Sequence, residues 1–185
     1  TILSSNSKAV MFMPICSRPP RGMILNLELL IFFKNFLIFI FPCSSSNPFI
    51  NSEKIITDCL ILLSNWENKK CICSKELLIE PSAIKNILYS LNDLSLNSIA
   101  VYVDDVLAGF SIGEVFNDSA IIHIEKCNTD YRGIYAFINN EFLKSSFKDT
   151  KYVNREEDCG HEGLQKSKES YHPYKILNKY FVKIK

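Results

Sequence analysis

The chain has 185 residues, of which 47% are hydrophobic, so it is long enough for one domain with a buried core. Lysine and arginine number 21 against 20 aspartates and glutamates, and the formal net charge is +1 at pH 7. A chain of such balanced charge lacks the broad field that attracts DNA or an anionic membrane surface. We therefore expect no DNA partner, and we expect any charged ligand to be bound by a local cluster of residues.

The cysteines and the short motifs exclude several kinds of site. The seven cysteines are an odd number and lack the paired spacing of a zinc site, and Cys71 and Cys73 are the closest pair. The chain also has no Walker loop, no Gly-x-Gly-x-x-Gly and no His-Glu-x-x-His. We interpret the cysteines as reduced thiols of a cytoplasmic protein, and we expect neither a metal ion nor a cofactor.

Residues 1–49 are predicted to form an irregular, apolar N-terminal segment. Residues 1–23 show no periodicity, and their Arg-Pro-Pro-Arg run opposes helix formation. Residues 24–41 are strongly apolar but include Glu28 and Lys34, and a charge at the centre of a membrane span costs roughly 2.5–3.5 kcal/mol. Three interpretations stay open for this stretch: a membrane helix, a buried apolar helix, or sequence not native to the domain. Because the chain begins at Thr1, we expect a fragment or a processed product.

Residues 50–185 are predicted to form the folded domain, after a polar break at residues 44–48. The 3.6-residue periodicity indicates helices over residues 52–66, 81–91 and about 130–142, and a further helix from residue 162 to about 177, interrupted near Pro173. Apolar, β-branched runs indicate strands over residues 98–103, 106–115, 120–125, 151–153 and 180–184. This order predicts an α/β (α+β) fold with a mixed, mostly antiparallel sheet and flanking helices.

The junction between residues 120–125 and the next helix is a candidate anion site. It contains Glu125, Lys126, Asp130, Tyr131, Arg132 and Gly133. Because the first backbone N–H groups of a helix have no partner within it, a helix start with glycine and arginine can bind a phosphate or an acyl oxygen. In the alternative interpretation, Arg132 pairs with Asp130 or Glu125 at the surface. The residues alone favour neither.

A second candidate lies at the exit of the next strand, where residues 154–158 read Asn-Arg-Glu-Glu-Asp. Alternation along a strand would place Glu156 and Asp158 on one face, with Arg155 and Glu157 on the other. Partly buried carboxylates have raised pKa values and can accept a proton from an attacking amine or hydroxyl. The alternative is a solvated acidic loop that caps the following helix.

Lys166, Lys168 and Lys175 follow this block, with Tyr171 nearby, and form either a phosphate-binding face or an ordinary solvated one. His123, on a predicted strand, is interpreted as a structural histidine with satisfied hydrogen bonds. No serine or cysteine stands in a nucleophile-elbow sequence, which argues against a catalytic triad.

Two separated motifs resemble one known family. Residues 123–135 read His-Ile-Glu-Lys-Cys-Asn-Thr-Asp-Tyr-Arg-Gly-Ile-Tyr, residues 152–158 read Tyr-Val-Asn-Arg-Glu-Glu-Asp, and Gly160, Glu162, Gly163, Leu164, Lys166, Lys168, Tyr171 and Pro173 follow. Together they are similar to the phosphatidylglycerol lysyltransferase C-terminal-like family over about residues 50–185. The resemblance implies a fold like the Gcn5-related N-acetyltransferases, with this chain supplying the second of two lobes and lacking the first.

The resemblance also implies a function: transfer of an aminoacyl or acyl group from an aminoacyl-tRNA or acyl-CoA donor to a lipid or small-molecule acceptor. With the residues above, it indicates Glu156, Asp158 and Glu125 as candidate catalytic residues. The candidate substrate-binding residues are Lys126, Tyr131, Arg132, Gly133, Asn154, Arg155, Lys166, Lys168 and Tyr171. Two alternatives stay open: acetyl-CoA-dependent N-acetylation, although the Arg-x-x-Gly-x-Gly loop is absent, and a non-catalytic binding module or inactive remnant.

Overall fold

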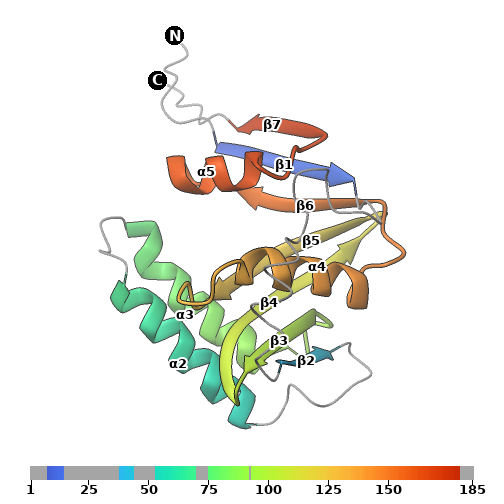
Figure 1. Cartoon of the computed structure of the whole chain (residues 1–185). Coiled ribbons are helices and arrows are strands. Elements are labelled where there is room, and N and C mark those ends of the chain that lie inside the picture. Colours follow the sequence, from blue (N-terminus) through green and yellow to red (C-terminus); the bar gives the residue numbers. More distant parts are fainter. Residues whose placement is uncertain (1–7, 15–37, 44–52, 70–74, 92, 180–185) are drawn as a thin grey trace.

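One seven-stranded sheet organises the protein in the computed structural model, which describes residues 8–14, 38–43, 53–69, 75–91 and 93–179 (Figure 1). The strands are β1 (Lys8–Pro14), β2 (Ile38–Cys43), β3 (Asn97–Val103), β4 (Val106–Phe116), β5 (Ser119–Cys127), β6 (Tyr152–Glu157) and β7 (Lys175–Lys179). The helices are α2 (Glu53–Lys69), α3 (Lys75–Tyr89), α4 (Ile134–Ser146) and α5 (Glu162–Glu169). The strand order is β2-β3-β4-β5-β6-β1-β7, and every neighbouring pair is antiparallel except β5 and β6. The predicted fold class is confirmed.

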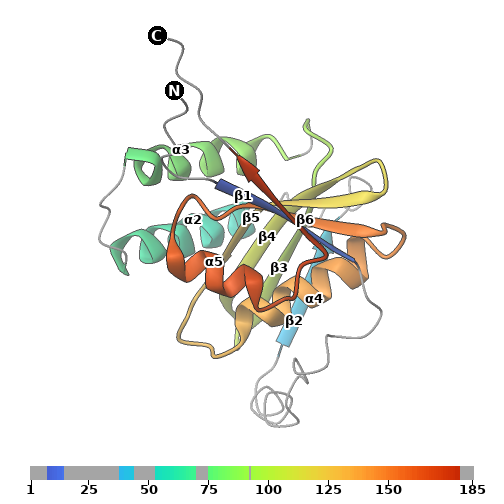
Figure 2. The same cartoon turned by 90° about the horizontal axis from the view of Figure 1, so that it is seen from above.

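The helices cover both faces of the sheet, with α2 and α3 on one side and α4 and α5 on the other (Figure 2). Buried side chains form one apolar cluster with α2 and α3 and another, which we call the α4 cluster, with α4. Strand β3 is buried on both faces, because Ala100 and Tyr102 belong to the first cluster whereas Val101 and Val103 belong to the α4 cluster. This double burial explains its continuous apolar run. The α4 cluster ends in an edge contact between Phe142 and Phe147, whose ring centroids are 4.8 Å apart.

The N-terminal part of the chain differs from the irregular segment predicted for residues 1–49. Strand β1 pairs with both β6 and β7, and β2 pairs with β3 at the edge of the sheet, so both belong to the fold. From Ile38 on, the described residues of the apolar stretch 24–41 are therefore extended, as neither of the two helical interpretations expected. Residues 24–37 lie outside the described part of the chain. Among the described residues, no helix is both long and apolar enough to cross a membrane.

Two further boundaries differ from the prediction. Helix α3 begins at Lys75 and includes Pro81, the residue at which we expected it to start. Helix α5 ends at Glu169, and Lys175–Lys179 forms strand β7 instead of continuing the helix to about residue 177. The partner of β7 is β1, which no local pattern near residue 175 indicates. The strand predicted over residues 180–184 lies outside the described residues.

Strands β5 and β6 separate toward their carboxyl ends. They pair in parallel at Ser119 with Tyr152, Ala120 with Val153 and Ile121 with Asn154. Beyond these pairs, residues 122–127 of β5 and 155–157 of β6 show no ladder pairing with each other, and we call this region the fork. In open α/β sheets, ligands bind outside the carboxyl ends of the strands. The fork is therefore the position at which a ligand site is expected in this fold.

Candidate functional site

A buried ion pair bridges the fork. Arg155 Nη2 of β6 lies 2.6 Å from Glu125 Oε1 of β5, and the two side chains are only 11% and 9% exposed. The other carboxylate oxygen of Glu125 accepts a hydrogen bond from Asn139 Nδ2 of α4 at 3.3 Å. The Tyr171 ring covers the guanidinium, with its centroid 4.5 Å from Cζ. The Glu125 carboxylate, which Asn139 holds in place, and the face of the Tyr171 ring thus hold Arg155 in one position.

One nitrogen of Arg155 has no hydrogen-bond partner among the residues that the structure describes. Its Nη1 is buried and makes no hydrogen bond to any residue that the structure describes. A buried donor left unsatisfied costs about 1–3 kcal/mol, so native structures seldom retain one without a reason. An oxygen acceptor on a ligand would satisfy it.

Lys168 of α5 fastens the end of β6. Its Nζ is buried and donates hydrogen bonds to the backbone oxygens of Arg155 at 2.5 Å and Glu157 at 2.6 Å. Burial, and then the nearby Arg155 charge, lower the pKa of Lys168 to about 8. Lys168 thereby sets the path of the backbone that carries the guanidinium.

A histidine makes a second bridge across the fork. His123 is the extra residue of a β-bulge in β5, because Ile122 and Ile124 pair with consecutive residues of β4. Its Nδ1 lies 2.6 Å from Glu156 Oε1, and its Nε2 lies 3.0 Å from Glu114 Oε1. The hydrogen bond to Glu156 is the main cause that raises the pKa of His123, which makes an imidazolium between two carboxylates more favourable.

Glu156 itself lies in a second bulge, in β6, with a φ of 54°. Its N–H donates to Asn154 Oδ1 at 2.8 Å, so Asn154 stabilises this turn of the backbone. Asp158 is 3% exposed, and its Oδ1 accepts the N–H of Gly160 at 2.8 Å. Glu156 therefore presents a partly exposed carboxylate, while Asp158 shapes the loop into α5.

The start of α4 is the other predicted part of the site. The N-cap is Gly133, with a φ of 82° and no side-chain cap, so the helix begins later than the predicted start at about residue 130. Arg132 is exposed and forms no ion pair with a described residue. The expected alternative partners are engaged elsewhere, since Asp130 pairs with Lys69 at 2.9 Å and Glu125 pairs with Arg155. Within the described part of the chain, Arg132 is available to an anion.

Three predicted residues lie apart from the fork's ion pair. Lys126 is on the opposite face of β5, where its Nζ lies 2.7 Å from Glu80 of α3 and 3.6 Å from the Trp66 ring centroid. Glu125 and Lys126 separate because successive residues of a strand point to opposite faces. Lys166 lies on the exposed side of α5, paired with Glu162. Tyr131 packs against the α4 cluster and contributes backbone to the helix start.

The structure thus brings Glu125, Arg155, Glu156, Lys168 and Tyr171 together around the end of β6. Our sequence reasoning missed Asn139 and Glu114, and it did not connect His123 to Glu156. Asn139 had a signal: it lies between Ile138 and Phe142 on the buried face of α4, where a polar side chain needs a partner. The contacts of Glu114 depend on the two bulges, and no pattern in the sequence indicated them.

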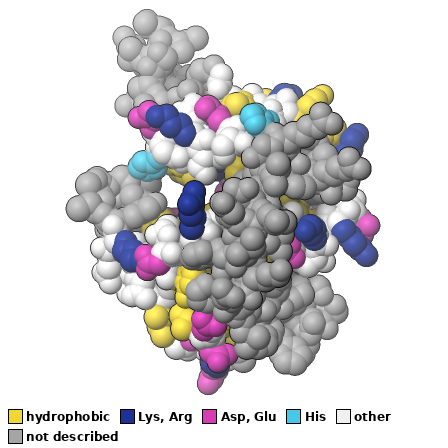
Figure 3. Space-filling view, in the orientation of Figure 1, with side chains coloured by type: hydrophobic (Ala, Val, Ile, Leu, Met, Phe, Trp, Pro, Cys, Tyr) yellow, Lys and Arg dark blue, Asp and Glu magenta, His cyan; other side chains and the backbone are white. Residues whose placement is uncertain are grey.

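The surface seen in Figure 3 has no large area of one charge among its described residues, and its acidic and basic side chains are interspersed. This distribution agrees with the balanced net charge and leaves local contacts as the means of binding a charged ligand.

Comparison with known proteins identifies the family. The family model described as phosphatidylglycerol lysyltransferase, C-terminal, matches residues 46–183. An uncharacterised protein of Mycoplasmoides gallisepticum is 32% identical over 94 residues, which are 51% of this chain and 30% of that protein. The chain thus spans less than a third of this relative.

Several solved structures have a similar fold. A conserved protein of unknown function from Bacteroides thetaiotaomicron has a TM-score of 0.80 at 26% identity, over 97% of this chain and 60% of that one. The C-terminal domain of a putative lysylphosphatidylglycerol synthetase from Agrobacterium fabrum has a TM-score of 0.58 at 12% identity, over 94% of this chain and 58% of that one. The L-PGS of Bacillus licheniformis gives 0.58 at 11% identity, over the same shares. The chain spans about three fifths of each of these structures.

Proposed function

Because the chain belongs to the phosphatidylglycerol lysyltransferase C-terminal family, we propose that it is an acyltransferase-type domain that handles an aminoacyl or acyl ester at the fork. The acceptor would be a lipid or small-molecule hydroxyl or amine. The proposal extends to this chain a reaction type that the family's description names, and the arrangement of the fork supports it.

The observation that carries the proposal is the unsatisfied Nη1 of Arg155. An ester carbonyl oxygen would accept a hydrogen bond from this nitrogen, and it gains negative charge when the carbonyl carbon is attacked. A buried, fixed donor stabilises that developing oxyanion more strongly than water does, because it needs no reorganisation. The contacts to Glu125 and Tyr171 supply the fixed position.

The proposed reaction forms one bond and breaks one. The acceptor oxygen or nitrogen bonds to the carbonyl carbon, and the bond from that carbon to the donor's leaving oxygen breaks. The acceptor loses a proton and the leaving oxygen gains one. We assign the proton acceptor to Glu156, because its carboxylate is partly exposed and hydrogen-bonded to His123, whereas Asp158 is buried in a turn. Arg132, at the start of α4, is the proposed contact for donor phosphate.

The test is a transfer assay on the purified chain. A minimal aminoacylated RNA stem and acetyl-CoA are each offered as donor, with phosphatidylglycerol or a primary amine as acceptor. We expect aminoacyl transfer from the RNA stem, and we expect Arg155→Lys to abolish most of it. Transfer from acetyl-CoA alone would instead support the N-acetyltransferase alternative. A folded protein that transfers nothing from either donor would refute the proposal.

A further inference from the structure

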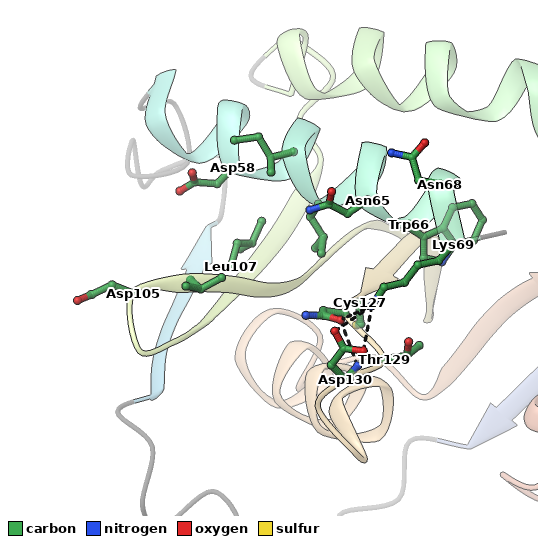
Figure 4. Close-up of a pocket in the computed structure, with 14 residues that line it drawn as sticks. Asp58, Asn65, Trp66, Asn68, Lys69, Asp105, Leu107, Cys127, Thr129 and Asp130 are labelled. Atoms are coloured by element: carbon green, nitrogen blue, oxygen red, sulfur yellow. Dashed lines mark hydrogen bonds and ion pairs between the residues drawn. The ribbon is translucent and has the colours of Figure 1, made fainter.

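A second candidate binding site lies away from Arg155, Glu156 and Lys168, none of which lines it. An open pocket of about 750 Å³ is lined by α2, the turn between β3 and β4, and the connection from β5 to α4 (Figure 4). This volume is within the range of small-molecule sites, which is about 300–1,000 Å³.

The walls of the pocket are largely apolar. Ile61 and Leu62 line it from α2, and Val106 and Leu107 line it from the start of β4. Ile61 and Val106 are 55% and 57% exposed, so the pocket leaves large apolar side chains in contact with water. A ligand with an apolar stem would remove this surface from water, at roughly 25 cal/mol per Å².

The charges of the pocket are unequal at its two ends. At one end, Lys69 Nζ lies 2.9 Å from Asp130 Oδ2, and the pair is neutral overall. At the other end, Asp58 of α2 and Asp105 of the turn both line the pocket near Leu107 (Figure 4). Neither of these two aspartates has a cationic partner among the described residues.

The two aspartates differ in their neighbours. Asp58 Oδ2 accepts the Tyr102 hydroxyl hydrogen at 2.8 Å, which fixes the carboxylate without neutralising it. Asp105 has a φ of 63° in the tight turn and is exposed. The pocket therefore has a negative end, a neutral end and apolar walls between them.

We propose that this pocket binds an organic ammonium compound, a primary amine on an apolar stem. The ammonium group lies at the end of the pocket that Asp58 and Asp105 line, and the stem extends along Leu62 and Leu107 toward Trp66. An anionic ligand of the same shape is repelled from the negative end, and a neutral one gains only the apolar contacts. The proposal does not depend on the transfer reaction at the fork.

The test uses the only tryptophan of the chain, Trp66, which lines the pocket. Hexylammonium, hexanol and hexanoate share one stem and differ in charge, and each is titrated while Trp66 fluorescence and the amide NMR shifts of Val106 and Leu107 are followed. We expect hexylammonium to bind most tightly and hexanoate most weakly. Equal affinities for the three probes, or shifts that avoid these residues, would overturn the proposal.

Charge-neutral variants locate the ammonium group. Asp58→Asn combined with Asp105→Asn should weaken hexylammonium about three- to tenfold, as expected for two partly exposed charge contacts, and leave hexanol unchanged. Asparagine tolerates the positive φ at residue 105. The control is Asp149→Asn, an exposed residue in the α4–β6 loop that does not line the pocket and should change neither affinity. An unchanged hexylammonium affinity in the folded double variant would contradict the assignment.

Discussion

Arg155 and Glu125 face each other across the fork between β5 and β6, with Nη2 and Oε1 2.6 Å apart and both side chains almost fully buried. Glu125 uses both oxygens within the protein, whereas Arg155 keeps Nη1 unused among the described residues. The carboxylate therefore acts as a support for the guanidinium, and the guanidinium has a donor left for a ligand. This difference leaves the guanidinium of Arg155, and not the carboxylate of Glu125, with a group for binding a ligand.

Removing only the guanidinium of Arg155 should destabilise the folded protein. In Arg155→Met, the carboxylate of Glu125 is left buried without its partner, and we expect a loss of about 3–5 kcal/mol in the free energy of unfolding. The double variant Glu125→Gln, Arg155→Met carries no charge at either position and should be more stable than the single variant. Urea denaturation measures both. A double variant less stable than Arg155→Met would show that the pair is not coupled in this way.

The His123 bridge should make stability depend on pH. Its pKa is raised in the folded protein, chiefly by the hydrogen bond to Glu156, so the bridge stabilises the fold below the unfolded pKa of about 6.5. This stabilisation is lost as pH rises through the folded pKa. Because the three side chains are partly exposed, we expect an effect below about 1 kcal/mol.

The comparison for this prediction is His123→Gln, which can donate to one carboxylate but cannot titrate. Urea midpoints from pH 5.5 to 8.5 should show that the advantage of the unmodified protein shrinks toward high pH. An advantage that grows with pH would contradict the predicted direction.

Replacing Lys168 should loosen the end of β6. Lys168→Met leaves the carbonyl oxygens of Arg155 and Glu157 without this donor, and we expect a loss of about 1–3 kcal/mol. Burial lowers the pKa of Lys168 to about 8, against about 10.4 in an unfolded chain. Between these values the unfolded chain binds more protons, so the unmodified protein should gain stability relative to Lys168→Met as pH rises. Thermal unfolding of both proteins at pH 7 and pH 9.5 tests this direction. A difference in melting temperature that becomes smaller at pH 9.5 would contradict it.

Two glycines should respond oppositely to alanine. An added Cβ at Gly113 of β4 would lie 2.4 Å from the backbone oxygen of Ile121, which cannot move away without disturbing the sheet. We expect Gly113→Ala to destabilise the protein by about 2 kcal/mol or more. At Gly163 in α5, a Cβ meets no described atom within 4 Å, so Gly163→Ala should stabilise by about 0.5–1 kcal/mol. Differential scanning calorimetry should give a lower melting temperature for Gly113→Ala than for the unmodified protein, and a higher one for Gly163→Ala. Equal melting temperatures of the two variants would contradict this prediction.

Periodicity predicted the parts of the fold whose burial is local. The helix expected over residues 52–66 is observed as α2, because Ile55, Cys59 and Leu63 recur on one buried face. The resemblance to the lysyltransferase C-terminal family is likewise confirmed. Strands β1, β2 and β7 were not predicted, because their pairing partners lie far away in the sequence or carry no local signal.

The sequence predicted several residues of the site but not the contacts between them. Glu125 and Arg155 were both candidates, yet they were placed at two separate junctions, and their pairing depends on the parallel register of β5 and β6. Strict alternation grouped Glu156 with Asp158, but the bulge at Glu156 interrupts the strand, so Glu156 binds His123 instead. Bulges and registers depend on neighbouring strands, and a single-strand pattern does not contain them. The catalytic and binding roles of these residues stay predictions.

The measurement that tests the central claim most directly is donor binding to Arg155→Lys by isothermal titration with the aminoacylated RNA stem. Lysine retains the positive charge opposite Glu125 but lacks the planar fork of donors. We predict that the RNA stem binds Arg155→Lys at least about tenfold more weakly than the unmodified protein, as expected for loss of a buried charged donor, and that the melting temperatures are similar. Lys148→Met, an exposed change in the loop before β6 and away from the fork, should bind normally. Equal affinity of Arg155→Lys and the unmodified protein would contradict the claim that Nη1 is the ligand's hydrogen-bond donor.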